Sequence, residues 1–331
     1  MSRAGEIEVV EPPMDAISKV LFSPVDPTLL VVSSWNKTVG IYQAHHQSNL
    51  NVKKTMYLHK AAVLDVDFST NGDCLYSGGL DLKLTKIDLK SDVQSEIGSH
   101  ELPISCIRTT SDMTITGSWD KSIKLWDDRN SDPLMTTLEQ TEKVFSLDVC
   151  KEKMVVALAN RIILVYDLRN TSAPLETKES NLKYMTRKIA CIPNGKGYAT
   201  SSIEGRVAVD FFDTADQSKK FSFKCHRQKV DECEFIYPVN ALTYHPQHQE
   251  TFASGGGDGV VSIWDGLNKK RLRQYPAYPT SISSLSFNCD GTQLAVASSY
   301  TFEEGEKDHP QDAIFLRSIA ANEAAPKSKT R

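Results

Sequence analysis

Residues 114–127 read TITGSWDKSIKLWD, and residues 252–265 read FASGGGDGVVSIWD. Each stretch begins with small and β-branched side chains, reaches a polar turn at Asp120 or Asp258, and ends in a Trp-Asp pair. β-Branched residues favour strands, whereas Asp and Gly favour tight turns. Both stretches therefore predict two antiparallel strands joined by a short turn.

The same pattern recurs along the chain, at 31–42, 75–87, 155–167, 199–212 and, in part, 294–300. The turn residues of the first six sets are Asn36, Asp81, Asp120, Asn160, Glu204 and Asp258. Successive turn residues lie 45, 39, 40, 44 and 54 positions apart. Another alternating strand precedes each set, as at 63–68 and 144–149. Repeats of about 40–45 residues with up to four strands are typical of propeller blades. The sequence therefore predicts an all-β fold, a seven-bladed β-propeller.

The ring must be closed by pairing its first and last strands, because an open ring leaves a free sheet edge. The last set has only three predicted strands, at 282–287, 294–299 and 313–317. A short apolar stretch at Ile7–Val10 supplies a fourth, so we expect an N-terminal strand to close the propeller. This predicts a single domain over 1–319. The Ala/Lys-rich segment 320–331 lacks an apolar period, and we expect it to be a disordered C-terminal tail.

The segments SWDKSIKLWD and GDGVVSIWD resemble the WD-repeat family, whose Trp-Asp signature they contain. The resemblance implies a hydrogen-bonded network of His100, Asp120 and Trp126 within one blade. It implies an equivalent role for Asp258 with Trp264. In that family such residues hold the turn and the strands together, so we expect these five residues to be structural.

Composition and motifs exclude several functions. The formal net charge of −4 argues against bulk nucleic-acid binding, and the longest apolar runs are far shorter than the roughly 20 residues that cross a bilayer. The chain has no GxSxG, no Walker-type phosphate loop and no HExxH. The glycines of 254–259 sit at a predicted β-turn, and His245 and His248 lie where a strand runs into a loop. We therefore expect no enzyme, no metal and no cofactor.

Two tryptophans and an arginine indicate a binding face. Trp35 and Trp119 each precede a turn residue, at a position where other repeats have residues from Gly to Ile. Packing does not demand Trp there, and Trp dominates interface hot spots. Arg206 follows the turn of the fifth repeat, so it should project from the same face. The three residues predict a clamp for a partner segment, although gap-filling aromatics and an ordinary surface arginine would give the same pattern.

A basic stretch follows the fifth repeat. Residues 218–229 read SKKFSFKCHRQK and contain five Lys or Arg and no acid. Alternation in FSFKCHR predicts an outer strand with Lys224 and His226 on one side. Such a patch suits a phosphate or an acidic peptide. A solvated basic strand edge, protected against aggregation, is the alternative.

The chain resembles the spindle-assembly-checkpoint WD-repeat proteins of the budding-uninhibited-by-benzimidazole group. The likeness lies in SSIEGRVAVDFFD (201–213), FKCHR (223–227), YPVNALTYH (237–245), NKKRLRQY (268–275) and YPTSISSLSF (278–287). It spans nearly the whole chain. A sister family, the messenger-RNA-export WD-repeat proteins that dock on a nucleoporin, shares the architecture.

The resemblance implies a non-enzymatic adaptor of the nucleus, and of the kinetochore in mitosis. Such proteins hold an extended segment of a checkpoint kinase or kinase-like partner across the propeller, and Trp35, Trp119 and Arg206 match its contacts. They read phosphothreonine in Met-Glu-Leu-Thr repeats of a kinetochore scaffold protein.

Arg227 matches one basic contact to that phosphate, and a second falls near Gln249, which has no charge; Lys224 or Lys220 would compensate. We expect no membrane and no direct nucleic-acid contact. Docking on a nucleoporin and substrate recruitment in a ubiquitin ligase are the alternatives.

Overall fold

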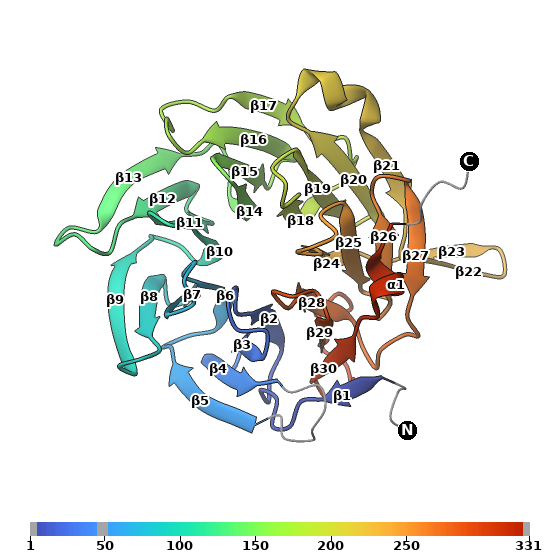
Figure 1. Ribbon diagram of the computed structural model, residues 1–331, viewed down its shortest axis with the longest axis horizontal. Coiled ribbons are helices and arrows are strands. Elements are labelled where there is room, and N and C mark those ends of the chain that lie inside the picture. Colours follow the sequence, from blue (N-terminus) through green and yellow to red (C-terminus); the bar gives the residue numbers. More distant parts are fainter. Residues whose placement is uncertain (1–4, 45–51, 327–331) are drawn as a thin grey trace.

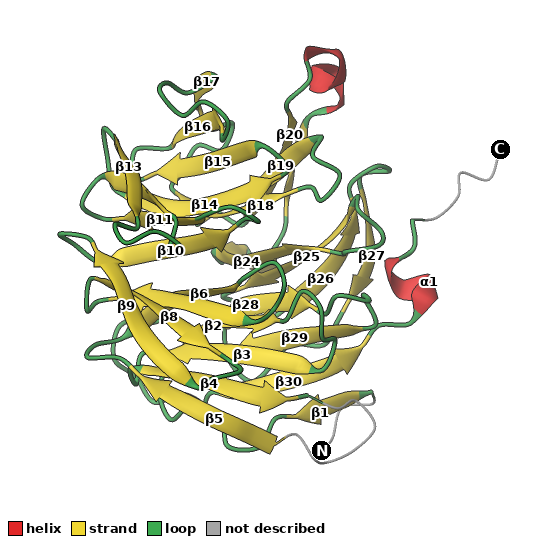
Figure 2. Cartoon of the chain, turned by 60° about the vertical axis from the view of Figure 1, so that its left-hand side comes forward, coloured by secondary structure: helices red, strands yellow, loops and turns green. Residues whose placement is uncertain are grey.

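The computed structural model describes residues 5–44 and 52–326. Over these residues the strands form seven four-stranded sheets and one two-stranded hairpin. The sheets stand around a common axis, with the first strand of each blade nearest the centre and the fourth at the rim (Figure 1). The side view shows the strands of neighbouring blades stacked face to face (Figure 2). The predicted seven-bladed, all-β propeller is confirmed.

The first four blades follow the chain in order. Blade 1 consists of β2 (Ile17–Phe22), β3 (Leu29–Ser34), β4 (Thr38–Gln43) and β5 (Val52–Leu58). Blade 2 consists of β6 (Val63–Phe68), β7 (Cys74–Gly79), β8 (Lys83–Asp88) and β9 (Val93–Ser99). Blade 3 consists of β10 (Ile104–Thr109), β11 (Thr114–Ser118), β12 (Ser122–Trp126) and β13 (Leu134–Glu139). Blade 4 consists of β14 (Val144–Cys150), β15 (Lys153–Leu158), β16 (Ile162–Asp167) and β17 (Glu176–Glu179).

The last three blades include the hairpin, two helices and the closing strand. Blade 5 consists of β18 (Thr186–Cys191), β19 (Gly197–Ser202), β20 (Arg206–Phe211) and β21 (Phe221–Lys224), with the 3-10 helix η1 (Thr214–Lys219) before β21. The hairpin β22 (Arg227–Val230) and β23 (Cys233–Ile236) follows. Blade 6 consists of β24 (Val239–Tyr244), β25 (Thr251–Gly256), β26 (Val261–Asp265) and β27 (Lys270–Gln274). Blade 7 consists of β28 (Ile282–Phe287), β29 (Gln293–Ser298), β30 (Ala313–Ser318) and β1 (Glu6–Glu8), and the helix α1 (Ala321–Ala324) follows β30.

The N-terminal strand closes the ring, as the sequence predicts. β1 pairs antiparallel with β30, with Ile7 opposite Leu316. The strand is Glu6–Glu8, two residues shorter at its end than the apolar stretch, although the Val9 N–H still bonds the Ile314 carbonyl at 2.8 Å. The Glu6 carboxylate accepts a hydrogen bond from Tyr278 Oη at 2.7 Å and pairs with Arg317. The closing strand is therefore held by side chains as well as by the ladder.

The repeated turns share one backbone device. The residue after each predicted turn residue has a positive φ, between 62° and 71°. These residues are Lys37, Leu82, Lys121, Arg161, Gly205 and Gly259. In five of the six turns the Asn or Asp side chain accepts the N–H two residues further on, as Asp120 does from Ser122 at 2.9 Å. This side-chain bond favours the turn and offsets the strain of a left-handed residue.

The core lies between neighbouring blades. Apolar side chains of adjacent sheets interdigitate, and in blades 3 and 4 these include Ile115, Leu147 and Val156, all fully buried. Successive residues of a strand point to opposite faces, so a blade covered on both sides buries nearly every position of its inner strands. The strand β19 is buried at all six residues. The rim strands, such as β13, alternate between exposed and half-buried residues.

The segment after blade 7 corrects one expectation. The prediction that 320–331 is disordered is wrong for Ala321–Ala324, which form the helix α1. Ala324 is buried, and its carbonyl accepts a hydrogen bond from Thr251 Oγ1 at 2.8 Å. The small alanine side chains let this turn of helix pack closely against blade 6. A search for an apolar period could not detect such packing. Residues 327–331 lie outside the described part. None of the helices described has the length and apolar character needed to cross a membrane.

His245 is a buried histidine that the fold holds neutral. Its Nδ1 accepts the backbone N–H groups of Gln247 and His248, at 3.2 and 3.0 Å, and its Nε2 donates to the Gly291 carbonyl at 3.1 Å. Burial, and then the charge of His248, lower the pKa of His245 from 6.5 to about 4. The two occupied ring nitrogens explain this histidine without a metal.

We expect the free energy of unfolding to fall as the pH drops from about 6.5 to 4. Protonation of His245 is favoured in the unfolded chain, so acid shifts the equilibrium toward unfolding. The loss should be about 2 kcal/mol after allowance for solvent screening. Urea unfolding at a series of pH values measures it, with His245→Asn as the variant and the exposed His309→Asn as the control. An identical acid-dependent loss in His245→Asn would contradict the assignment.

Candidate partner-binding site on the top face

One face of the propeller holds the turns that follow the second strand in each of the first six blades, at 35–37, 80–82, 119–121, 159–161, 203–205 and 257–259; we call it the top face. Because every blade has the same strand order, these turns lie at the same end of the ring. Trp35, Trp119 and Arg206 therefore belong to one face. Trp35 is 45% exposed and Trp119 is half-buried. Blades 1 and 3 thus offer indole surface to a ligand that crosses this face.

The backbone fixes where the two tryptophans stand. The N–H of Trp35 bonds the Ala16 carbonyl at 2.9 Å, and the N–H of Trp119 bonds the Pro103 carbonyl at 3.1 Å. Each bond ties a turn to the loop that enters the first strand of its own blade. A backbone fixed in this way does not have to be ordered when a ligand covers the indoles, which lowers the entropic cost of binding.

Arg206 lies in a cavity of about 590 Å³ beside blade 5, which we call the blade-5 cavity. Its basic lining residues are Lys183, Arg206, Lys224 and Arg227, and its acidic one is Glu204. Lys224 stands directly opposite Arg206 in the pairing of β20 with β21. Arg206 Nε lies 3.6 Å from the Glu204 carboxylate, a weak pairing that leaves donors available. The excess of positive charge suits an acidic ligand.

Arg227 has more partners than the sequence suggests. Its Nη2 donates to the Glu204 carbonyl at 2.8 Å, its Nε to the Gly205 carbonyl at 3.4 Å, and its Nη1 pairs with Glu234 at 3.2 Å. The arginine therefore braces the turn before Arg206 while it lines the cavity. The two ends of the hairpin lie beside blade 5, so Arg206, Lys224 and Arg227 line the same cavity.

Lys220 and Gln249 lie elsewhere. Lys220 precedes β21, whose far end carries Lys224, so the two lysines stand at opposite ends of the same strand. Gln249 lies in the loop between β24 and β25, also at the end of its blade away from the top face. The basic stretch 218–229 is therefore not one patch, because a four-residue strand and a sharp turn at His226, with φ of 49°, divide it. The structure brings neither residue into the blade-5 cavity.

The structural network expected in blade 3 is present with an additional member. His100 Nδ1 lies 2.8 Å from Asp120 Oδ2, and its Nε2 lies 2.7 Å from Thr116 Oγ1, which also accepts Trp126 Nε1–H at 2.8 Å. Burial lowers the pKa of His100, although Asp120 opposes this shift. The hydroxyl of Thr116 is the link that sequence reasoning missed.

Blade 6 repeats this network with a histidine that the sequence did not assign to it. Asp258 Oδ1 lies 2.8 Å from His226 Nδ1, and His226 Nε2 lies 2.8 Å from Ser254 Oγ, which accepts Trp264 Nε1–H at 2.8 Å. His226 is buried and faces away from solvent, so the expectation that it shares an exposed side with Lys224 is wrong. Its ring anchors the start of the hairpin to blade 6.

Several residues of the cavity were not singled out from the sequence. Lys183 and Tyr184 come from the loop between β17 and β18, and Ile236 ends the hairpin. No spacing rule joins them to Arg206, because they come from two separate segments, the loop before β18 and the hairpin. The one available signal was the segment LKYMTRKIA, which holds a basic and an aromatic residue before a buried strand.

The ring of repeats and its Trp–hydroxyl–His–Asp networks define a WD-repeat propeller. In agreement, the family model "WD domain, G-beta repeat" matches residues 50–84, 91–127 and 218–265. The chain is 47% identical to "Mitotic checkpoint protein BUB3.1" of Arabidopsis thaliana over 330 residues, which cover 97% of this chain and 95% of that protein. It is 44% identical to "Mitotic checkpoint protein bub3" of Dictyostelium discoideum, covering 93% of each. The chain belongs to the Bub3 family of mitotic checkpoint proteins.

The sister family is also similar. A "Poly(A)+ RNA export protein" of Schizosaccharomyces pombe is 34% identical over 332 residues, which cover 98% of this chain and 93% of that protein. The resemblance to checkpoint WD-repeat proteins drawn from the sequence is confirmed, and so is the relation to the export proteins.

Proposed function

We propose that this protein is a non-enzymatic adaptor of the mitotic checkpoint, located in the nucleus and at kinetochores in mitosis. Its top face binds an extended segment of a checkpoint kinase or kinase-like partner, with Trp35 and Trp119 as apolar anchors and Arg206 as the partner of an acidic residue. Membership of the Bub3 family supports the checkpoint assignment. The exposure of Trp35 and the charge around Arg206 support the placement of the segment.

The adaptor then recruits its partner by reading phosphothreonine in Met-Glu-Leu-Thr repeats of a kinetochore scaffold protein. The observation that supports this step is the blade-5 cavity, where four basic side chains surround one glutamate. A phosphothreonine has a charge of about −1.5 to −2 at neutral pH and three strong acceptor oxygens. Lys224 is exposed, and no hydrogen bond or ion pair engages its ammonium among the residues described, so it is the most available donor for the phosphate.

We expect Lys224→Ala to remove most of the preference for the phosphorylated peptide, by roughly tenfold, because one charge-assisted hydrogen bond is lost. Lys220→Ala removes the same charge at the far end of β21 and should leave the preference intact. Fluorescence polarisation of phosphorylated and unphosphorylated Met-Glu-Leu-Thr peptides, with the kinase segment bound, measures both. Equal affinities on the wild type would refute phosphate reading, whereas an equal effect of both variants would refute the cavity as its place.

Arg227→Ala is a poorer test of phosphate reading. The substitution removes a bond to the Glu204 carbonyl and so loosens the turn that positions Arg206. We therefore expect it to weaken both the phosphopeptide and the kinase segment. Loss of the phosphopeptide alone would show that the turn does not depend on Arg227.

Messenger-RNA export by docking on a nucleoporin is the second candidate, because the export proteins match nearly the whole chain. The higher identity to the checkpoint proteins favours the first. Affinity purification from mitotically arrested cells, followed by mass spectrometry, separates them. Recovery of checkpoint kinases is expected. Recovery of a nucleoporin without these kinases would favour the export function over the checkpoint function.

A further inference from the structure

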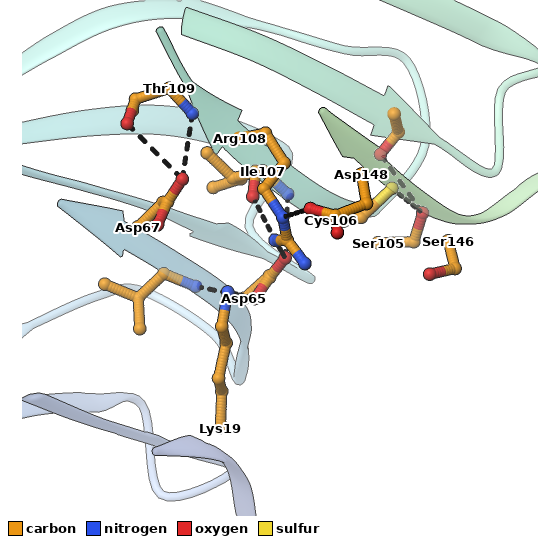
Figure 3. A network of polar contacts seen from close by, with 12 residues as sticks. Lys19, Asp65, Asp67, Ser105, Cys106, Ile107, Arg108, Thr109, Ser146 and Asp148 are labelled. Carbon is orange, nitrogen blue, oxygen red and sulfur yellow. Dashed lines mark hydrogen bonds and ion pairs between the residues drawn. The ribbon is translucent and has the colours of Figure 1, made fainter. Parts of the chain in front are cut away.

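The first strands of the seven blades surround the propeller axis and are joined by side chains that reach from one blade to the next. Asp65 of blade 2 accepts the backbone N–H of Ile107 in blade 3 at 2.8 Å, and Asp67 accepts that of Thr109 at 2.8 Å (Figure 3). Asp148 of blade 4 accepts the N–H of Cys191 in blade 5 at 2.7 Å. These carboxylates therefore take the place of ladder bonds that separate sheets cannot make.

Two cations neutralise part of this acidic ring. Lys19 Nζ lies 2.6 Å from Asp65 Oδ1, and Arg108 Nε donates to Asp148 Oδ1 at 2.6 Å. Arg108 Nη1 donates to the Ile107 carbonyl at 2.6 Å and lies 3.4 Å from Asp65 Oδ2. Figure 3 shows the guanidinium lying between the carboxylates of Asp65 and Asp148. Among the described residues, Arg108 Nη2 has no hydrogen-bond partner, so donors remain.

Lys188 is different, because it is half-buried and has no polar partner among the described residues. It comes from β18 in blade 5, and within the described ranges its ammonium makes no hydrogen bond or ion pair. Burial lowers its pKa to about 8, Asp65 opposes the shift, and the charges of Arg108 and Lys19 add to it. Three cations thus converge from blades 1, 3 and 5. A half-buried ammonium that makes no hydrogen bond is an available donor for an anion that enters the space beside it.

These cations line a cavity of about 270 Å³ around the axis, the channel cavity. Tyr244 Oη and Ser283 Oγ, from two other residues of its lining, are shielded from solvent and have no hydrogen-bond partner in the described structure. The carboxylates in the lining are already engaged, Asp148 by Arg108 and Asp67 by Thr109. Burial raises the pKa of Asp67, which reduces the charge that would oppose an anion.

We propose that the channel cavity binds a small oxyanion of the phosphate or sulfate class, with the Lys188 ammonium as its main partner. Arg108 has donors to spare on the same cavity, whereas Lys19 Nζ and the hydroxyl groups of Tyr244 and Ser283 are closed off within its wall. A tetrahedral oxyanion accepts several charge-assisted hydrogen bonds, whereas water offers no charge to offset the ammonium. The volume admits a small ion with some water, not a peptide side chain with its backbone. The site draws its cations from blades 3 and 5.

Calorimetric titration of the full chain with inorganic phosphate, sulfate and chloride at matched ionic strength tests the site. We expect saturable binding of phosphate or sulfate and none of chloride. Lys188→Gln should weaken the binding at least tenfold, since it removes the one cation that has no protein partner. Lys220→Gln, an exposed lysine at the rim of the same blade, should not change it. Comparison of the two oxyanions tells which of them the cavity prefers.

A thermal-shift series with the same salts provides the second measurement. Sulfate and phosphate stabilise any protein somewhat because they are excluded from its surface. The site therefore predicts an additional stabilisation that the wild type shows and Lys188→Gln lacks. Equal responses of the wild type and Lys188→Gln, or no saturable binding, would overturn the proposal. If Lys188→Gln fails to fold, Lys188→Met decides: it keeps the length of the side chain without the charge, and unchanged oxyanion affinity in this variant would also count against the site.

Discussion

Replacement of Trp119 by alanine is expected to weaken binding of the kinase segment by about 30- to 1000-fold, with no change in the melting temperature. Truncation of an interface tryptophan often costs about 2–4 kcal/mol. Trp119 lies in a turn on the top face, is half-buried, and belongs to none of the blade cores. Its side chain is thus available to a ligand and is dispensable for folding. Isothermal titration calorimetry with the isolated segment gives the dissociation constant.

The control for this variant is Met135→Ala, which truncates an exposed apolar residue on the rim strand of the same blade. It should bind the segment as the wild type does. Trp35→Ala should lose affinity in the same direction, because both indoles stand on one face. An unchanged dissociation constant for Trp119→Ala, together with normal melting, would remove blade 3 from the interface.

Asp65→Ala is expected to lower the free energy of unfolding by about 3–5 kcal/mol, the range found when one partner of a buried ion pair is removed. Asp65 is 2% exposed, and burial alone would raise its pKa, but Lys19, with Lys188 and Arg108, lowers it to about 2. Without the carboxylate, Lys19 loses its ion-pair partner and the Ile107 N–H loses its acceptor. Equilibrium unfolding in urea measures the loss.

The matched control is Asp132→Ala, an exposed aspartate in a loop of blade 3. Surface substitutions of this kind usually change stability by less than about 0.5 kcal/mol. Asp65→Asn should fall between the two, since it keeps an oxygen for the Ile107 N–H but loses the charge. A loss below about 1 kcal/mol for Asp65→Ala would show that the axial network adds little to the stability of the ring.

The blades could be predicted because their signals are local. Each turn residue, such as Asp120 or Asn36, acts on the N–H two positions later, so the chemistry is visible in a few consecutive letters. Ring closure was predictable for another reason. Blade 7 lacked a fourth strand in the sequence, and the N-terminal segment contained a predicted strand that no other blade used. The axial network was missed, although acids at alternate positions of a buried strand, as in VLDVDF (63–68), mark carboxylates that need partners.

The blade-5 cavity could not be derived in the same way. An interval of 54 residues between turns indicates an insertion but not its path. The path depends on a left-handed residue at His226 and on its bond to Asp258, which turn the chain out of β21 and into the hairpin. Only then does Arg227 return to the turn of blade 5. Contacts of this kind depend on the fold as a whole. The sequence analysis treated the basic stretch as one continuous patch, and it therefore did not predict that the fold divides it.

The pairing of β1 with β30 also affects how the protein folds during its synthesis. Glu6 and Arg317, which meet in blade 7, are 311 residues apart in the sequence. Contacts of such large separation form late and slow folding. At about 5–20 residues per second, synthesis of these 331 residues takes roughly 17–66 s. Throughout that time β1 has emerged but its partner strand has not, and the nascent ring has an unpaired edge. Protection from edge-to-edge aggregation is thus needed during synthesis, a demand on chaperones that ends when the last blade is complete.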